Sequence, residues 1–324
     1  MSQREFFAID RQTWERALKL GMNPACLFLI MARGTWRDNK STLWSVNALE
    51  KYTGIGRRRG KDALAMLIKH KIIKKEKGGK HPKFTLKKQC KDVDLIWLPN
   101  ELVTGIENAV PPLERVRQTG DVLCLRLLID FYFINSPVDD GGIPRDCVFQ
   151  SYERKDISET GNMIVYGFDR NVLTCYPDHP VVEPHVLHRK SEQCEAFFER
   201  LNTLIDLGLI SFVPFLIESE DKDSEFIHPL IDPYTGDCEL VERARYQAVE
   251  MIGECYQYEA ENFDYVVPVV LHRKNNTVAG IGFLKYRPKT SLTAAGYANI
   301  QELYKHWLEI YESVNSQPEK IAVG

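Results

Sequence analysis

The first ninety residues alternate between hydrophobic patterns typical of helices and of strands. Apolar residues spaced three and four apart predict helices, and short apolar runs bounded by glycine predict strands. In chain order, the predicted elements are a strand at 6–9, helices at 10–20, 24–33, 46–52 and 57–70, and strands at 72–76 and 84–86. A Thr-Gly-Ile-Gly turn at 53–56 joins the last two helices, because glycine permits a tight reversal. A glycine pair lies between the last two strands and predicts a β-hairpin.

From residue 93 onward, the same order of elements is predicted to recur as a second copy. Its predicted elements are a strand at 95–99, helices at 120–135 and 191–207, and a strand pair at 211–217 and 225–231. The later helix is followed by glycine, Leu-Ile and a strand, which is also the order that ends the first copy. An insertion near 147–188 enlarges this second copy.

The C-terminal ninety residues predict a small α/β module. Its predicted elements are a helix at 240–256, strands at 265–272 and 278–284 that form a hairpin, and an amphipathic helix at 299–314. We therefore expect the α+β class, with domains at 1–92, 93–235 and 236–324.

Charge divides the chain more sharply than its formal net charge of −3 suggests. The segment up to Lys91 holds 22 basic and 7 acidic residues, so it carries +15 and the remainder carries −18. Residues 51–91 alone contain 15 basic residues and two acidic ones, Asp62 and Glu76. The cationic end indicates a polyanionic partner, double-stranded DNA. The acidic C-terminal two thirds is expected to face solvent, a protein partner or a second copy in a homodimer.

The cations concentrate on the predicted helix at 57–70 and on the hairpin that follows it. A helix enters the major groove with its first residues against the base edges, where arginine pairs with guanine. Gly60 is expected to let this helix approach the duplex closely, and the hairpin is expected to follow the phosphates or the minor groove. The candidate DNA-binding residues are Arg57, Arg58, Arg59, Lys61, Lys69, Lys74, Lys75, Lys77, Lys80, His81 and Lys83.

The order of elements over 45–88 resembles the winged helix-turn-helix superfamily. It is most similar to the forms in GntR-type regulators and in plasmid or phage replication initiators, where a Ser-led helix, a Thr-Gly turn and an Ala-Leu-x-x-Leu helix run into a two-stranded wing. The resemblance implies an N-terminal winged helix, and the second copy is interpreted as a winged-helix-like domain with an insertion. Its helix at 191–207 lacks a cationic cluster, so we expect it to pack against protein.

Three functions remain open at this point. The first is a sequence-specific bacterial or phage transcriptional regulator that reads the major groove with the helix starting near Arg57. The second is a plasmid or phage replication initiator that binds origin repeats, a class that the resemblance links to tandem winged helices. The third is a tandem winged-helix interaction subunit of a larger DNA-associated machine.

Motifs for nucleotide or nuclease chemistry are incomplete. Gly54 opens a glycine pattern like that of dinucleotide-binding loops, but no buried strand precedes it. Asp62 stands where a phosphate-binding loop needs Ser or Thr. Asp232 and Glu239 have a spacing suited to a metal-dependent nuclease, but Leu-Val follows Glu239 directly, where such a site requires a catalytic lysine. We therefore expect no enzymatic activity and no cofactor.

The cysteines indicate reduced thiols and not a metal site. All eight are spread along the chain without a C-x-x-C pair. The densest set of potential zinc ligands comprises Cys175, His179, His185 and His188. Their spacing fits no standard zinc site, so we expect no metal. No apolar stretch approaches 20 residues and the first ten residues lack a signal pattern, so we expect a cytoplasmic, nucleoid-associated protein without membrane contact.

Overall fold

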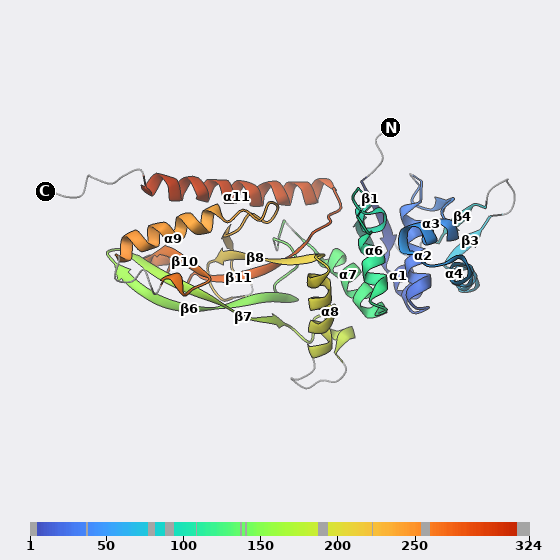
Figure 1. The fold of residues 1–324 in the computed structure, drawn as a ribbon, viewed down its shortest axis with the longest axis horizontal. Helices are drawn as coiled ribbons and strands as arrows, with labels where there is room; N and C mark the ends of the chain where they lie inside the picture. Colours follow the sequence, from blue (N-terminus) through green and yellow to red (C-terminus); the bar gives the residue numbers. More distant parts are fainter. Residues whose placement is uncertain are drawn as a thin grey trace. The chain divides into compact units, whose positions relative to one another are not determined.

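The computed structural model has a mixed α+β fold (Figure 1). It describes residues 5–36, 38–76, 82–87, 94–107, 109–136, 138–139, 141–186, 194–221, 223–253 and 260–315. The chain forms two compact units. The first comprises Met1–Asn135, Glu183–Ile210 and Leu284–Thr293, and the second Ser136–Val182, Ser211–Phe283 and Ala294–Gly324. These bounds differ from the three consecutive domains that we predicted, which remain a prediction. Within the described residues, no helix is long and apolar enough to span a bilayer.

The first unit begins with β1 (Phe6–Asp10), α1 (Arg11–Leu18) and α2 (Met22–Arg33). Asp10 caps α1 as its position predicts, because Oδ1 accepts a hydrogen bond from the backbone N–H of Thr13 at 2.7 Å. All residues from 24 to 32 of α2 are buried. This helix is therefore the central element of the N-terminal segment.

Two further helices pack against α2, and a small three-stranded sheet contacts the second of them. These are α3 (Val46–Thr53), α4 (Arg57–Lys69), β2 (Ser41–Thr42), β3 (Ile73–Lys75) and β4 (Phe84–Leu86). Gly54 ends α3 with φ +65°, a left-handed conformation that favours glycine. The strands form an antiparallel sheet in the order β2-β4-β3, so the predicted pairing of β3 with β4 is confirmed. The sequence did not predict β2, because two residues are too few for a periodic pattern.

The rest of the first unit contains a second strand, which pairs with β1, and several helices. Its elements are β5 (Leu95–Pro99), α5 (Glu101–Thr104), α6 (Pro112–Gln118), α7 (Val122–Ile134), a 3₁₀ turn (Glu183–His185) and α8 (Glu195–Asp206). β5 runs antiparallel to β1, with Phe6 opposite Pro99 and Asp10 opposite Leu95. α2 packs against β1 and α7 packs against β5.

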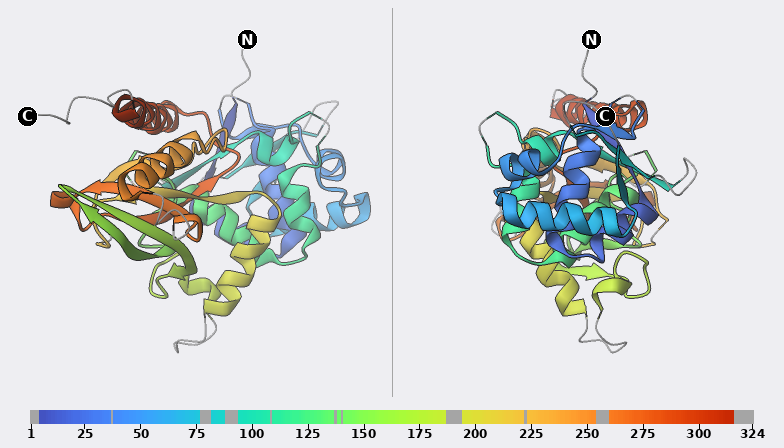
Figure 2. Two further views of the ribbon diagram at one scale, coloured as in Figure 1. Left: turned by 60° about the vertical axis from the view of Figure 1, so that its left-hand side comes forward. Right: turned by 90° about the vertical axis from the view of Figure 1, so that its right-hand side faces the viewer.

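The second unit is built on a six-stranded sheet in the order β10-β7-β6-β11-β8-β9. Its strands are β6 (Val148–Thr160), β7 (Met163–Cys175), β8 (Ile210–Ile217), β9 (Phe226–Pro229), β10 (Tyr265–Val270) and β11 (Thr277–Leu284), with a 3₁₀ turn at Leu271–Arg273. Two helices, α9 (Glu239–Ile252) and α11 (Ser291–Asn315), lie over one side of the sheet (Figure 2).

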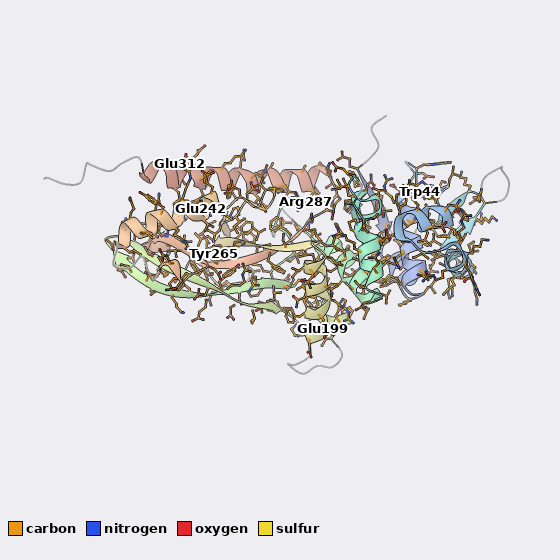
Figure 3. All side chains as sticks on the ribbon, viewed as in Figure 1. Trp44, Glu199, Glu242, Tyr265, Arg287 and Glu312 are labelled. Carbon is orange, nitrogen blue, oxygen red and sulfur yellow. The ribbon has the colours of Figure 1, made fainter. Side chains whose placement is uncertain are left out.

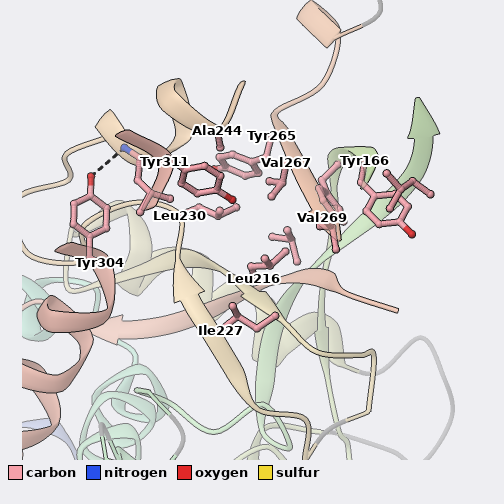
Figure 4. Packing of buried hydrophobic residues seen from close by; sticks show 14 residues of the cluster. Tyr166, Leu216, Ile227, Leu230, Ala244, Tyr265, Val267, Val269, Tyr304 and Tyr311 are labelled. Atoms are coloured by element: carbon pink, nitrogen blue, oxygen red, sulfur yellow. Dashed lines mark hydrogen bonds between the residues drawn. The ribbon is translucent and has the colours of Figure 1, made fainter. Parts of the chain in front are cut away.

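A hydrophobic core joins these helices to the sheet (Figure 4). Leu240 and Ala244 of α9 and Tyr304 and Tyr311 of α11 pack against strand residues such as Leu216. The hydroxyl of Tyr304 accepts a hydrogen bond from the backbone N–H of Leu240 at 3.3 Å. Both helices are thereby held to the same core.

The predicted C-terminal hairpin is wrong. β10 pairs with β7 and β11 pairs with β6, so the two strands lie on opposite sides of the β6–β7 hairpin. Each strand of that hairpin is 13 residues long, and it lies within the predicted insertion. Hydrophobic alternation identifies a strand but not its partner, and here the inserted hairpin supplies the partner for both. The predicted pairing of β8 with β9 is confirmed, although β8 also adjoins β11 and the pair belongs to the larger sheet.

Candidate nucleic-acid interface

Helix α4 has a buried face and an exposed, cationic face. Gly60, Ala63 and Leu67 are its buried residues, and the helix packs against α2 and α3. Because an α-helix has 3.6 residues per turn, Arg58 and Lys69 lie opposite this buried row. The exposed basic residues of α4 are Arg57, Arg58, Arg59, Lys61 and Lys69. All five predicted DNA-binding residues of this helix are therefore on the surface.

Gly60 has a different role from the one that we predicted. It is buried, and a Cβ at this position would lie 2.7 Å from Val46 Cγ1 and 3.3 Å from Leu49 Cδ2, both on α3. The missing side chain therefore lets α3 and α4 approach each other, and the prediction that it brings α4 closer to a duplex is wrong. Ile68 is 36% exposed, because it lies beside the buried row of α4 and not on it.

The cations at the start of α4 differ in their ion pairing. Arg57 Nε lies 3.0 Å from Glu50 Oε2 on α3, and both side chains are exposed. Such exposed pairs contribute little to stability, so this one can open at low cost. In the described part of the chain, no carboxylate lies within ion-pairing distance of Arg58, Arg59 or Lys61. Their charges are therefore available to an anionic partner.

The small sheet adds further cations beside α4. Lys74 and Lys75 are exposed on β3, and Lys74 Nζ lies 3.8 Å from Glu76 Oε2. The same carboxylate group accepts a hydrogen bond from Thr85 Oγ1 at 2.8 Å, which anchors it to β4. The predicted contacts at the hairpin tip lie outside the described residues; they are Lys77, Lys80 and His81.

An aromatic groove lies between the end of α2, β2 and α3, and sequence reasoning missed it. Trp44, marked in Figure 3, stacks on Tyr52 with ring centroids 5.2 Å apart, and the guanidinium of Arg33 lies 5.5 Å from the centroid of Trp44. Burial lowers the pKa of Arg33. Lys83, the remaining predicted DNA-binding residue, precedes β4. Its Nζ lies 5.0 Å from the ring centroid of Trp36, and the Trp36 side chain is 52% exposed. The only indication of this groove in the sequence was the group of aromatic residues within 36–52.

The alternative chemistries are not assembled in the described residues. Asp232 accepts backbone hydrogen bonds from Tyr234 and Thr235, and Glu239 pairs with Arg243, so both carboxylates are already engaged. No group of three or more His, Cys, Asp or Glu side chains suited to a metal occurs among the residues described.

The histidines considered for zinc lie in dissimilar settings. His185 is buried against Phe197, and burial lowers its pKa to about 4. His179 Nε2 lies 4.0 Å from Asp146 Oδ1, and burial lowers the pKa of His179. His188 lies outside the described residues.

Comparison with known proteins gave no relative for this chain. No family model matches it, and neither a curated protein nor a solved structure is significantly similar to it.

Proposed function

We propose that the N-terminal segment, residues 1–92, is a winged-helix domain that binds double-stranded DNA in a sequence-specific manner. The observation that carries this proposal is the exposed face of α4, where Arg58, Arg59 and Lys61 have no ion-pair partner among the described residues. The opposite face is fixed by packing against α2 and α3. The strand order β2-β4-β3 and the direct passage from α4 into β3 also support a winged-helix arrangement.

In the proposed complex, α4 enters the major groove and β3 follows the backbone. The groove is about 12 Å wide and admits one helix. Arg58 would pair with a guanine edge, since it lies opposite the buried face of α4. Lys74 and Lys75 would contact phosphates, because they are exposed on the strand that follows α4. The nearly unopposed positive charge of 51–91 would make binding strongly dependent on salt.

We propose a bacterial or phage transcriptional regulator as the first function. In the predicted second winged-helix-like domain, the charges of α8 support a role in contacting protein. Glu195 and Glu199 are exposed on this helix, and Arg200 Nε donates to Asp121 Oδ2 at 2.7 Å. The one arginine of α8 is therefore engaged within its own unit, and a protein partner or a second copy of the chain suits this helix better than DNA.

A replication initiator is the second candidate, and one observation favours it. β1 and β5 pair with each other, α2 packs on β1, and α7 packs on β5. This repeated arrangement suits a duplicated strand-and-helix element, as expected for tandem winged helices. It concerns architecture alone, so the choice between regulator and initiator depends on the DNA site.

Selection of bound duplexes from a random DNA pool tests the proposal. We expect enrichment of one motif and a specificity ratio of at least about 10³ over random duplex. A short palindrome would indicate a regulator, and an array of direct repeats protected in a footprint would indicate an initiator. Duplex binding with a ratio near one would leave only the interaction subunit. Absence of duplex binding at low salt would refute the proposal.

A further inference from the structure

Asp62 is the one acidic residue of α4, and it lies within the cationic surface that is proposed to face DNA. It is exposed, and it lies one helical turn after Arg58 and about two turns before Lys69. A carboxylate at this position repels the phosphates of a bound duplex, so it weakens binding to DNA of any sequence. Its presence there calls for a compensating interaction.

An ion pair within the protein does not provide that compensation among the described residues. Arg58 and Arg59 precede Asp62 by four and three residues, which is the spacing of helical ion pairs. Neither guanidinium lies within 4.0 Å of the carboxylate, whereas Arg57 does pair with Glu50. Asp62 therefore has acceptor capacity left for a ligand.

We propose that Asp62 reads cytosine in the major groove by accepting a hydrogen bond from its N4 amino group. This inference rests on the proposed function. Guanine and thymine present acceptor oxygens in the major groove, which repel a carboxylate. Adenine presents an amino donor beside the N7 acceptor, whereas cytosine presents the amino donor alone. Cytosine is therefore the base edge with which a carboxylate is most compatible.

The helix geometry also places this cytosine relative to the base read by Arg58. Four residues of an α-helix advance by about 6 Å, and successive base pairs are about 3.4 Å apart. The two contacts should therefore fall one or two base pairs from each other. The selected motif should contain a position that depends on Arg58 and a C·G pair within two steps of it.

The test is selection from a random duplex pool with the full chain and four variants, Asp62→Ala, Asp62→Asn, Arg58→Ala and Glu302→Ala. Asp62→Ala should lose the cytosine preference at one position by about fivefold or more and keep the others. Asp62→Asn should move the preference at that position to adenine, because asparagine pairs bidentately with adenine. Glu302→Ala removes the same charge from an exposed position of α11, in the second unit, and should select the wild-type motif. Arg58→Ala identifies the neighbouring position.

Two results would overturn the assignment of Asp62 while leaving the proposed function intact. One is an Asp62→Ala protein that still selects the wild-type cytosine. The other is an Asp62→Ala protein with a wild-type melting temperature that loses preference at every position, because Asp62 would then act by orienting the arginines. A wild-type protein without any sequence preference would overturn the proposed function and this inference together.

Discussion

The contact between α3 and α4 through Gly60 allows a quantitative prediction about stability. Gly60→Ala places a Cβ 2.7 Å from Val46 Cγ1, which is well inside van der Waals contact. Val46 is a buried β-branched residue within a helix, where one rotamer is strongly preferred, so it cannot easily rotate away. Overpacking of this kind costs about 1–3 kcal/mol. The better helix propensity of alanine returns about 1 kcal/mol.

A second substitution separates these two effects. Val46→Ala removes the methyl group at 2.7 Å, so most of the overpacking cost of Gly60→Ala should disappear in that background, where only Leu49 Cδ2 at 3.3 Å remains close. The effect of Gly60→Ala on the free energy of unfolding should therefore change from a loss of up to about 2 kcal/mol in the wild type to a gain of up to about 1 kcal/mol in the Val46→Ala background. The coupling energy between the two sites should be about 1–3 kcal/mol.

Urea unfolding followed by tryptophan fluorescence measures this coupling. Trp14, Trp36, Trp44 and Trp97 belong to the first unit, so the signal reports mainly on the unit that contains α3 and α4. Additive effects of the two substitutions, within about 0.5 kcal/mol, would refute the idea that Gly60 serves the approach of the two helices.

Three further predictions concern DNA binding and acid stability. Arg58→Ala combined with Arg59→Ala should remove most of the discrimination between the selected site and random duplex in a competition assay, leaving at most the preference that Asp62 provides. An unchanged motif would show that α4 is not the reading helix. Lys74→Ala combined with Lys75→Ala should weaken all duplexes alike and reduce the slope of log K against log salt by about 2, and a change of motif would contradict this. Burial lowers the pKa of His228 to about 4, below its usual 6.5, so the unfolded state binds more protons between these values. The free energy of unfolding should therefore fall by roughly 3 kcal/mol through this group as pH drops from 6.5 towards 4. In melting temperatures measured over this pH range, His228→Phe should show a smaller decrease than the wild type. An equal decrease in both proteins would contradict the idea that buried, neutral His228 contributes to the loss of stability in acid.

Local elements were predictable where the signal lies within one segment. The periods of α2, α3 and α4, the Asp10 cap and the glycine after α3 all follow from residues adjacent in sequence. The orientation of Gly60 was also available from sequence, since Ala63 and Leu67 follow it at helical spacing on the same face. We assigned Gly60 to the surface because its cationic neighbours dominated the interpretation.

Strand pairing was predictable only for neighbours in the chain. β3 with β4 and β8 with β9 are such neighbours. The partners of β10 and β11 lie about 100 or more residues earlier, and nothing in an apolar strand of six or eight residues names a distant partner. The aromatic groove was missed for a similar reason, because Trp36, Trp44 and Tyr52 meet only when β2 and α3 are in place.

The discontinuous course of the chain through its two units has a consequence for biosynthesis. The first unit includes Leu284–Thr293, and the second begins at Ser136, so neither unit is complete until most of the chain has been translated. At about 5–20 residues per second, residue 293 follows residue 1 by roughly 15–60 s. A nascent chain stalled at residue 92 would hold all of α4 but lack β5, the strand that pairs with β1. Both units therefore become complete at nearly the same stage of translation. A product terminated early would expose the unpaired edge of β1 to chaperones and proteases.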